Sequence, residues 1–256
     1  MTLLRFSIEH LVAYINWIYF YHAWGVKECN AYEIKKEAEA LLKKWSAEKR
    51  EVLFKVYIAF ANSKGEDILL HNANGTGDHV IPLLRQQHTP FLCLADFLPP
   101  VTMEAERMGV FASTVPFQVE GLLEQTLADR LAEAAAELGH EIVRKQIWAY
   151  APNENLSIEE LFAEHYQGKR PAVGYPSLPD QSINFVLSSL LDFPSLGISL
   201  TENGAMIPHA STTGLMISHP QCHHFKVGTI GEDQLADYAL RRGMTPDMIR
   251  KFIDIA

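Results

Sequence analysis

The sequence predicts a single α+β domain over residues 1–256, and three observations favour that class. Short runs of aliphatic and aromatic residues alternate with turn residues and have the length of buried strands. One long segment, 120–148, keeps the helical spacing of its apolar residues throughout. No internal repeat or low-complexity linker divides the chain, so we expect helices and strands to share a core.

The first part of the chain predicts a helix followed by a hairpin. Between residues 31 and 49, apolar residues recur at intervals of three and four with Lys and Glu between them, which is typical of an amphipathic helix. Residues 52–60 have the composition of a strand. The Asn-Ser-Lys-Gly run at 62–65 is typical of a turn, and residues 67–71 are expected to form the returning strand.

Further short buried strands are expected at 91–97 and 109–115, where the residues are mainly apolar, and residues 80–84 are apolar as well. The polar loop at 72–78 contains two glycines but lacks the spacing of a phosphate-binding motif. We therefore expect no nucleotide phosphate site there.

The longest predicted helix, 120–148, has an alanine-rich middle that favours helix formation and permits close packing. We expect it to lie at the centre of the domain. Pro152 and its neighbouring Asn residues interrupt the pattern, and Ser157 and Glu160 have the spacing of a capping box for a short second helix.

The end of the chain predicts a strand and two helices. Residues 225–230 are expected to form the strand, and 232–242 a helix that ends at Gly243. Pro246 is expected to open a final helix that continues to Ile255, since proline is favoured in a first turn.

Composition and charge exclude several classes of protein. The formal net charge of −9 argues against a nucleic-acid partner, which requires Lys and Arg to neutralise phosphates. The chain has three cysteines, an odd number, at positions Cys29, Cys93 and Cys222. No two of them form a C-x-x-C pair, so no disulfide framework is expected. Charged residues interrupt the first ten positions, which lack the apolar run of a signal peptide or membrane span. We expect a cytoplasmic protein without a membrane partner.

The segment 170–228 contains most of the residues whose side chains could bind a ligand. It begins with Arg-Pro-Ala-Val-Gly-Tyr-Pro-Ser-Leu-Pro-Asp at 170–180 and continues with Thr-Glu-Asn-Gly-Ala-Met-Ile-Pro-His-Ala-Ser at 201–211. Ser-His-Pro at 218–220 and Phe-Lys-Val-Gly at 225–228 follow. The segment thus supplies a cation, tight turns and aromatic or imidazole groups, which together suit a small zwitterion.

These motifs, in this order, resemble the activation domain of cobalamin-dependent methionine synthase, the part that binds S-adenosylmethionine. The resemblance continues through Val227–Met244 and covers the whole chain. Its other blocks are 14–17 (Tyr-Ile-Asn-Trp), 84–87, 93–97, 109–112, 127–133, 140–145 and 151–157 (Ala-Pro-Asn-Glu-Asn-Leu-Ser).

The resemblance implies a fold and a function. The fold is a curved α+β domain around a mainly antiparallel sheet. The function is to present S-adenosylmethionine to cobalamin held by another module, so that one electron from a reductant such as flavodoxin and one methyl group restore methylcobalamin. The chain lacks the D-x-H-x-x-G motif that binds cobalamin. We therefore expect a free-standing activation component of a methyltransferase, which meets cobalamin only through a separate methionine synthase polypeptide.

Arg170 is the first candidate for the ligand site. Its guanidinium offers a planar fork to a carboxylate, and the resemblance implies contact with the carboxylate end of S-adenosylmethionine. Gly174 and Tyr175 lie in the loop that follows, where glycine allows a backbone to approach adenine or ribose closely. The alternatives are an exposed arginine and an ordinary loop.

Two candidate positions differ from the family pattern. Asn16 stands where the family has Asp, and an amide loses the charge that would pair with a ligand ammonium or sulfonium. His224 and Phe225 stand where the family has two Tyr residues; His224 can still donate a hydrogen bond, and Phe225 keeps an apolar surface. Asn16 has a structural alternative, which is to cap a helix. These departures leave open a docking module that no longer binds S-adenosylmethionine.

Glu133 and Glu202 are the acidic candidates, expected to bond either the ligand ammonium or Arg170, with a solvated charge or a structural ion pair as the alternative. No catalytic residue is expected, because a sulfonium methyl group is already activated and the protein needs only to orient it. The series His219, Cys222, His223 and His224 fits no common zinc spacing, so no metal is expected.

Overall fold

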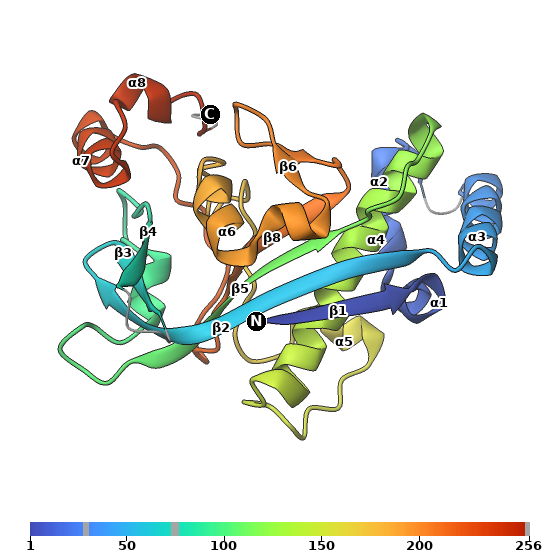
Figure 1. The fold of residues 1–256 in the computed structure, drawn as a ribbon, viewed down its shortest axis with the longest axis horizontal. Coiled ribbons are helices and arrows are strands. Elements are labelled where there is room, and N and C mark those ends of the chain that lie inside the picture. The colour runs from blue at the N-terminus through green and yellow to red at the C-terminus, as the bar shows by residue number, and fades with distance from the viewer. Residues whose placement is uncertain (28–30, 73–76, 254–256) are drawn as a thin grey trace.

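The computed structural model describes residues 1–27, 31–72 and 77–253. Its centre is a six-stranded antiparallel sheet with the strand order β4-β3-β2-β5-β8, in which β1 also pairs with β2 (Figure 1). The α+β class and the mainly antiparallel sheet are therefore confirmed. The strands are β1 (Thr2–Ser7), β2 (Glu51–Lys64), β3 (Asp67–His71), β4 (Asp78–Pro82), β5 (Glu106–Thr114), β6 (Ser199–Leu200), β7 (Met206–Ile207) and β8 (Ser211–Met216).

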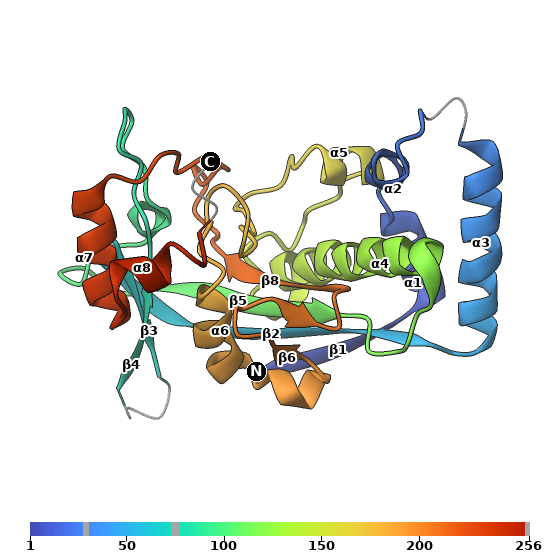
Figure 2. The ribbon, with the colours of Figure 1, turned by 90° about the horizontal axis from the view of Figure 1, so that it is seen from above.

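Helices cover both faces of the sheet. Figure 2 shows α4 along one face, and α6 with the small β6-β7 hairpin on the other. Figure 2 also shows α3 standing across one end of the sheet, and α7 and α8 at the opposite end. The helices are α1 (Ile8–Leu11), α2 (Trp17–Ala23), α3 (Tyr32–Ala47), α4 (Gly121–Ile142), α5 (Ile158–Phe162), α6 (Ile183–Leu191), α7 (Glu232–Arg242) and α8 (Pro246–Ile249).

The long strand β2 separates two hydrophobic cores, because its successive side chains point to opposite faces. Phe54 and Val56 belong to the core beneath α4, whereas Leu53 belongs to the core beneath α6. A third core joins α7 and α8 to Leu84. Within the described chain, no helix has both the length and the apolar character to cross a membrane.

The predicted central helix is confirmed as α4, whose 22 residues lie against β2, β5 and β8. Leu127, Leu131 and Ala135 are fully buried on its inner side, as the spacing predicts. The helix does not stay α-helical to residue 148, because Val143–Ile147 forms a π-helical turn. The long helix supplies one wall of the site described below.

Several other predicted elements are present. The amphipathic helix is α3, and the predicted hairpin is formed by β2 and β3. The capping box is complete, since the Ser157 amide donates to Glu160 at 2.8 Å and the Glu160 amide donates to Ser157 Oγ at 3.2 Å. Helix α7 ends at Gly243, which has a φ of 64°.

Three predictions are corrected. Residues 91–97 form no strand, because Asp96 accepts from the Cys93 amide at 2.8 Å and closes a 3₁₀ turn at Leu94–Phe97. Residues 225–230 also form no strand. The last helix ends at Ile249 rather than continuing to Ile255.

Some predictions fall outside the described residues. Positions 73–76 of the polar loop, 254–256 at the end of the last predicted helix, and Cys29 are not described. Cys93 and Cys222 are buried free thiols.

Candidate functional site

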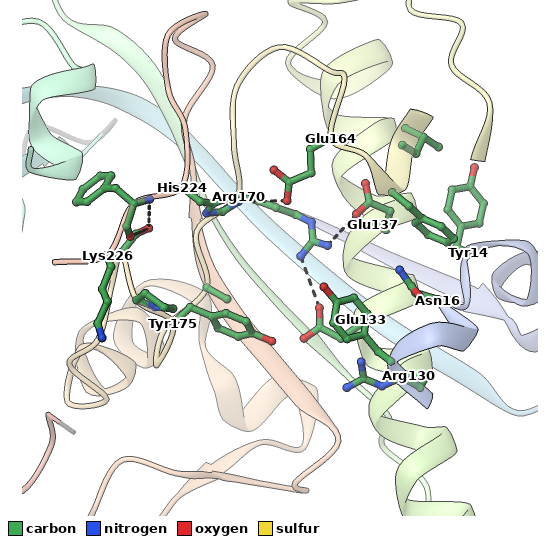
Figure 3. Close-up of a pocket in the computed structure, with 17 residues that line it drawn as sticks. Tyr14, Asn16, Arg130, Glu133, Glu137, Glu164, Arg170, Tyr175, His224 and Lys226 are labelled. Atoms are coloured by element: carbon green, nitrogen blue, oxygen red, sulfur yellow. Dashed lines mark hydrogen bonds and ion pairs between the residues drawn. The ribbon is translucent and has the colours of Figure 1, made fainter. Parts of the chain in front are cut away.

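A cavity of about 550 Å³ lies between α4 and the loops that follow it in sequence (Figure 3). Four parts of the chain form its walls: the segment 14–19, the α4 residues 130–137, the segment 161–177, and residues 224–226. The lining side chains are Tyr14, Asn16, Tyr19, Arg130, Glu133, Glu137, Leu161, Phe162, Glu164, Arg170, Ala172, Tyr175, Pro176, Ser177, His224, Phe225 and Lys226.

Arg170 is positioned by backbone pairing between its own segment and β8. The Lys169 amide donates to Ile217 O at 2.8 Å, and the Leu215 amide donates to Pro171 O at 3.0 Å. This approach requires glycine at position 214, because a Cβ there would lie 2.2 Å from Pro171 O. The segment is thus held against the sheet, and the Arg170 side chain reaches α4.

The Arg170 guanidinium is bound by carboxylates of α4. Its Nη2 donates to Glu137 Oε2 at 2.8 Å, and its Nη1 lies 3.7 Å from Glu133 Oε2. Burial works to lower the pKa of Arg170, but the charges of Glu137 and Glu133 outweigh it and the net shift is upward. Its buried Nε has no hydrogen-bond partner in the described part of the chain. Arg170 is therefore a fixed cation inside the cavity wall.

Glu164 faces Arg170 from the turn after α5 and is paired with His224. Glu164 Oε1 lies 3.3 Å from His224 Nε2, and Glu164 Oε2 lies 3.4 Å from Lys169 Nζ. The hydrogen bond with His224 is the main cause that lowers the pKa of Glu164, and it outweighs the opposing effect of burial. Glu164 is consequently an anion at neutral pH.

Aromatic side chains form the more open part of the cavity. Tyr19 and Tyr175 are 61% and 55% exposed, and Phe225 is half-buried. Ser177 fixes Phe225, because Ser177 Oγ donates to the Phe225 carbonyl at 2.6 Å and the Phe225 amide lies 3.0 Å from the same oxygen. Figure 3 shows Tyr175 pointing toward Glu133, and the charge of Glu133 is the first cause that raises the pKa of Tyr175.

Asn16 caps a helix and also lines the cavity. Its Oδ1 accepts from the Ile18 amide at 3.2 Å, which caps the start of α2, and the same side chain lines the cavity. The cap holds the 16–19 segment at the cavity, and so places Tyr19 in the wall.

Six of the eight residues expected at the ligand site line the cavity, and two do not. Gly174 has a φ of 87° and turns the chain so that Tyr175 reaches the cavity. Glu202 is exposed in the turn of the β6-β7 hairpin, whose Leu200 and Met206 pack into the core beneath α6. Glu202 therefore lies outside this cavity, on the opposite face of the sheet from α4.

Sequence reasoning missed Arg130 and Glu137, although their spacing could have found them. They lie three residues before and four residues after Glu133, which places all three on one face of a helix. Glu164 and Lys226 were also missed, because no local pattern distinguishes them.

The His and Cys series near residue 220 is held by local hydrogen bonds. His219 Nδ1 accepts from the Gln221 amide at 3.2 Å, and His223 Nδ1 lies 2.9 Å from the Gln221 carbonyl oxygen. Among the residues that the structure describes, no group of three His, Cys, Asp or Glu side chains is placed to hold a metal ion.

Comparison with known proteins agrees with this architecture. The family model for the activation domain of vitamin B12-dependent methionine synthase matches residues 7–243. A solved structure, the crystal structure of the MetH reactivation domain bound to AdoHcy, superposes with a TM-score of 0.89 at 37% sequence identity. The match covers 98% of this chain and 88% of that chain. The chain belongs to the family of vitamin B12-dependent methionine synthase activation domains.

Proposed function

We propose that the cavity binds S-adenosylmethionine and presents its methyl group to the cobalamin of a separate methionine synthase polypeptide. The observation that carries this proposal is one cavity in which Glu133, Glu164 and Arg170 meet an aromatic wall. The similar MetH reactivation domain was solved with AdoHcy, which is S-adenosylmethionine without its methyl group. That similarity supports the same ligand class here.

The size and charge of the cavity suit this ligand. Its volume of about 550 Å³ falls within the range of roughly 300–1,000 Å³ typical of small-molecule sites. Tyr19, Tyr175 and Phe225 offer surfaces on which adenine can stack. S-adenosylmethionine carries a sulfonium, an ammonium and a carboxylate. The cavity supplies charges of both signs for them, namely Glu133, Glu137 and Glu164 against Arg130, Arg170 and Lys226.

The two carboxylates best placed for the cationic groups are Glu133 and Glu164. Glu133 lies 3.7 Å from Arg170, beyond hydrogen-bond distance, so its oxygens remain available to a ligand. Glu137 is 8% exposed and holds Arg170 instead. Arg170 thus fixes the orientation of the α4 carboxylates, while Glu133 and Glu164 face the ammonium and sulfonium.

The contribution of this chain to the reaction is orientation. The methyl group of a sulfonium is already activated, so no side chain has to move a proton in the transfer. The cobalamin of the separate methionine synthase polypeptide would supply the nucleophile, once a donor such as flavodoxin had reduced it by one electron. The aromatic wall and the paired carboxylates keep the ligand in one pose.

Calorimetric titration with S-adenosylmethionine tests the ligand. We expect the parent protein to bind, and Glu133→Gln to bind about ten- to hundredfold more weakly, because one charge-assisted hydrogen bond is lost. Glu202→Gln is the matched control, since Glu202 lies outside the cavity, and it should bind as the parent does. No heat with the parent across several salt and pH conditions would refute the proposed ligand.

A reconstituted reaction tests the role. The protein is mixed with a cobalamin-loaded methionine synthase module, a one-electron reductant and S-adenosylmethionine. We expect the absorption spectrum of methylcobalamin to appear with one equivalent of S-adenosylhomocysteine for each methyl group transferred. Ligand binding without methylation would limit the function to binding.

A second function is a docking module for a corrinoid protein that has lost the methyl donor. The observation that favours it is that Asn16 and His224 each direct one polar atom to this chain. Asn16 Oδ1 accepts from the Ile18 amide, and His224 Nε2 lies 3.3 Å from Glu164 Oε1. Co-purification with a cobalamin protein, in the absence of any calorimetric signal for S-adenosylmethionine, would support it over the first.

A further inference from the structure

Tyr166 is a buried side chain of the segment 161–177. It is 6% exposed, and it stands two residues after Glu164 and four residues before Arg170. Those two residues line the cavity, whereas Tyr166 is not one of the lining side chains (Figure 3). Its contacts therefore affect where the segment places its charged groups, rather than the ligand itself.

Two cations lie against the Tyr166 ring. Arg144 Cζ is 4.0 Å from the ring centroid and Lys169 Nζ is 4.8 Å from it, both within the range of cation–π attraction. The two side chains are 0% and 13% exposed, so water screens this attraction little. His140 adds an edge-on contact at 5.0 Å between ring centroids. An aliphatic residue of similar size would fill the same space without attracting either cation.

Each of these cations is also paired with a carboxylate. Arg144 Nη2 donates to Glu154 Oε1 at 2.6 Å, and Lys169 Nζ lies 3.4 Å from Glu164 Oε2. Because both charges are compensated, two ion pairs share one ring without strong mutual repulsion. The ring thus joins the ion pair of the π-helical turn after α4 to the ion pair that holds Glu164.

Lys169 gives Glu164 a fixed place. Lys169 Nζ also donates to the Glu164 carbonyl oxygen at 3.0 Å, which closes the chain between the two residues into a compact turn. The Lys169 amide donates to Ile217 O at 2.8 Å, and the Ile217 amide donates to Lys169 O at 2.9 Å. Gly168 permits this approach, since a Cβ there would lie 2.3 Å from Ile217 O. Lys169 is therefore held at both ends, by the sheet and by the Tyr166 ring.

We propose that Tyr166 is a positioning residue for the ligand site, an inference that rests on the proposed function. The attraction of its ring for two cations holds residues 164–170 against α4 and the π-helical turn that follows it. Glu164 and Arg170 are thereby presented to the cavity from the two ends of one fixed segment. Groups that are fixed before a ligand arrives bind it more tightly, because no binding energy is lost in ordering them.

Two substitutions separate the aromatic face of Tyr166 from its volume. Tyr166→Leu keeps an apolar side chain without the face, and Tyr166→Phe keeps the face and removes only the hydroxyl. In calorimetric titrations of the full chain, we expect Tyr166→Leu to weaken S-adenosylmethionine binding about five- to thirtyfold and Tyr166→Phe to stay within about twofold of the parent. Adenosine has none of the charged groups of S-adenosylmethionine, so its affinity should change less than about twofold in either variant.

Replacing Tyr166 by mono-, di- and trifluorinated phenylalanine tests the cation–π attraction itself. The fluorine atoms withdraw electron density from the ring face stepwise, with little change of shape. We expect the affinity for S-adenosylmethionine to fall at each step, which a ring that only fills space would not cause. Phe193→Leu is the matched control. It replaces a fully buried ring of the core beneath α6, and should lower stability without changing ligand affinity.

Hydrogen exchange of the ligand-free proteins separates this inference from the proposed function. Tyr166→Leu should exchange faster than the parent in residues 161–170, while β2 and β5 exchange as before. If folded Tyr166→Leu binds S-adenosylmethionine as the parent does, or if the fluorinated series shows no trend, the inference is wrong and the function stands. If the parent does not bind S-adenosylmethionine, the proposed function fails, and equal exchange in the parent and Tyr166→Leu would refute the positioning as well.

Discussion

Glu164 illustrates how one side chain of the cavity is tuned by its neighbours. The hydrogen bond with His224 is the largest cause that lowers its pKa, and Lys169 adds to the effect. Because the folded pKa is depressed, the stabilisation is present above the ordinary pKa of the carboxyl group and is lost as pH falls through the depressed value. We expect His224→Gln to raise the pKa of Glu164 toward its ordinary range, as measured by carbon-13 NMR titration of the carboxyl group.

Lys169→Gln is the comparison for this titration. Its charge acts on the Glu164 carboxylate from 3.4 Å but ranks below the His224 hydrogen bond. The upward shift should therefore be smaller than in His224→Gln. An unchanged Glu164 pKa in His224→Gln would show that the ion pair does not exist in solution.

Sequence reasoning could identify candidate residues, but could not assign their partners. Arg170, Tyr175 and Phe225 stand in dense motifs, and all three line one cavity. The partner of Arg170 is Glu137, 33 positions earlier, and only the docking of the 169–173 segment on β8 brings them together. Glu202 stands in an equally dense motif but lies on the other face, since the hairpin that carries it packs beneath α6.

At the scale of elements, the fit of α4 on β2 depends on Gly139. A Cβ at this position would lie 2.6 Å from the ring of Phe54, which is fully buried and stacked on Phe111 at 6.0 Å between ring centroids. Overpacking at this contact should cost about 1–3 kcal/mol, and the better helix propensity of alanine offsets roughly 1 kcal/mol of it. We therefore expect Gly139→Ala to lower the free energy of unfolding by up to about 2 kcal/mol. Urea denaturation measures the difference.

A second alanine on the same helix isolates the packing effect. Gln125→Ala changes an exposed position of α4 and should alter stability by no more than about 0.5 kcal/mol. If Gly139→Ala proved as stable as the parent or more so, the close contact between α4 and Phe54 would be wrong.

Elements with a strong internal period were predictable, and those defined by distant partners were not. Helices α3, α4 and α7 carry their own hydrophobic spacing, and the β2-β3 hairpin carries its own turn. Residues 225–230 have strand composition but no strand beside them. The Val227 amide donates to Pro176 O, and Gly228 has a φ of 81°. Composition alone does not supply a pairing partner.

At the scale of the whole molecule, a buried ion pair between Arg144 and Glu154 links two of the segments next to the cavity. Arg144 is fully buried, donates to both oxygens of Glu154 at 2.6 and 2.9 Å, and lies 4.0 Å from the centre of the Tyr166 ring. These contacts join the π-helical turn after α4 to the segment that leads into Arg170. The walls on either side of the cavity are thereby connected through the interior rather than through the solvent-exposed loops.

Because the cavity walls come from four distant parts of the chain, the ligand should stabilise all of them together. We expect S-adenosylmethionine at one hundred times its Kd to raise the free energy of unfolding by about 2.7 kcal/mol. Hydrogen exchange should slow in the segments 14–19, 130–137, 161–177 and 224–226 alike. Adenosine, which lacks the amino-acid end, is the control and should protect α4 less, since Glu133 would have no ligand group to bind. Protection confined to one segment would mean that the ligand binds elsewhere than in this cavity.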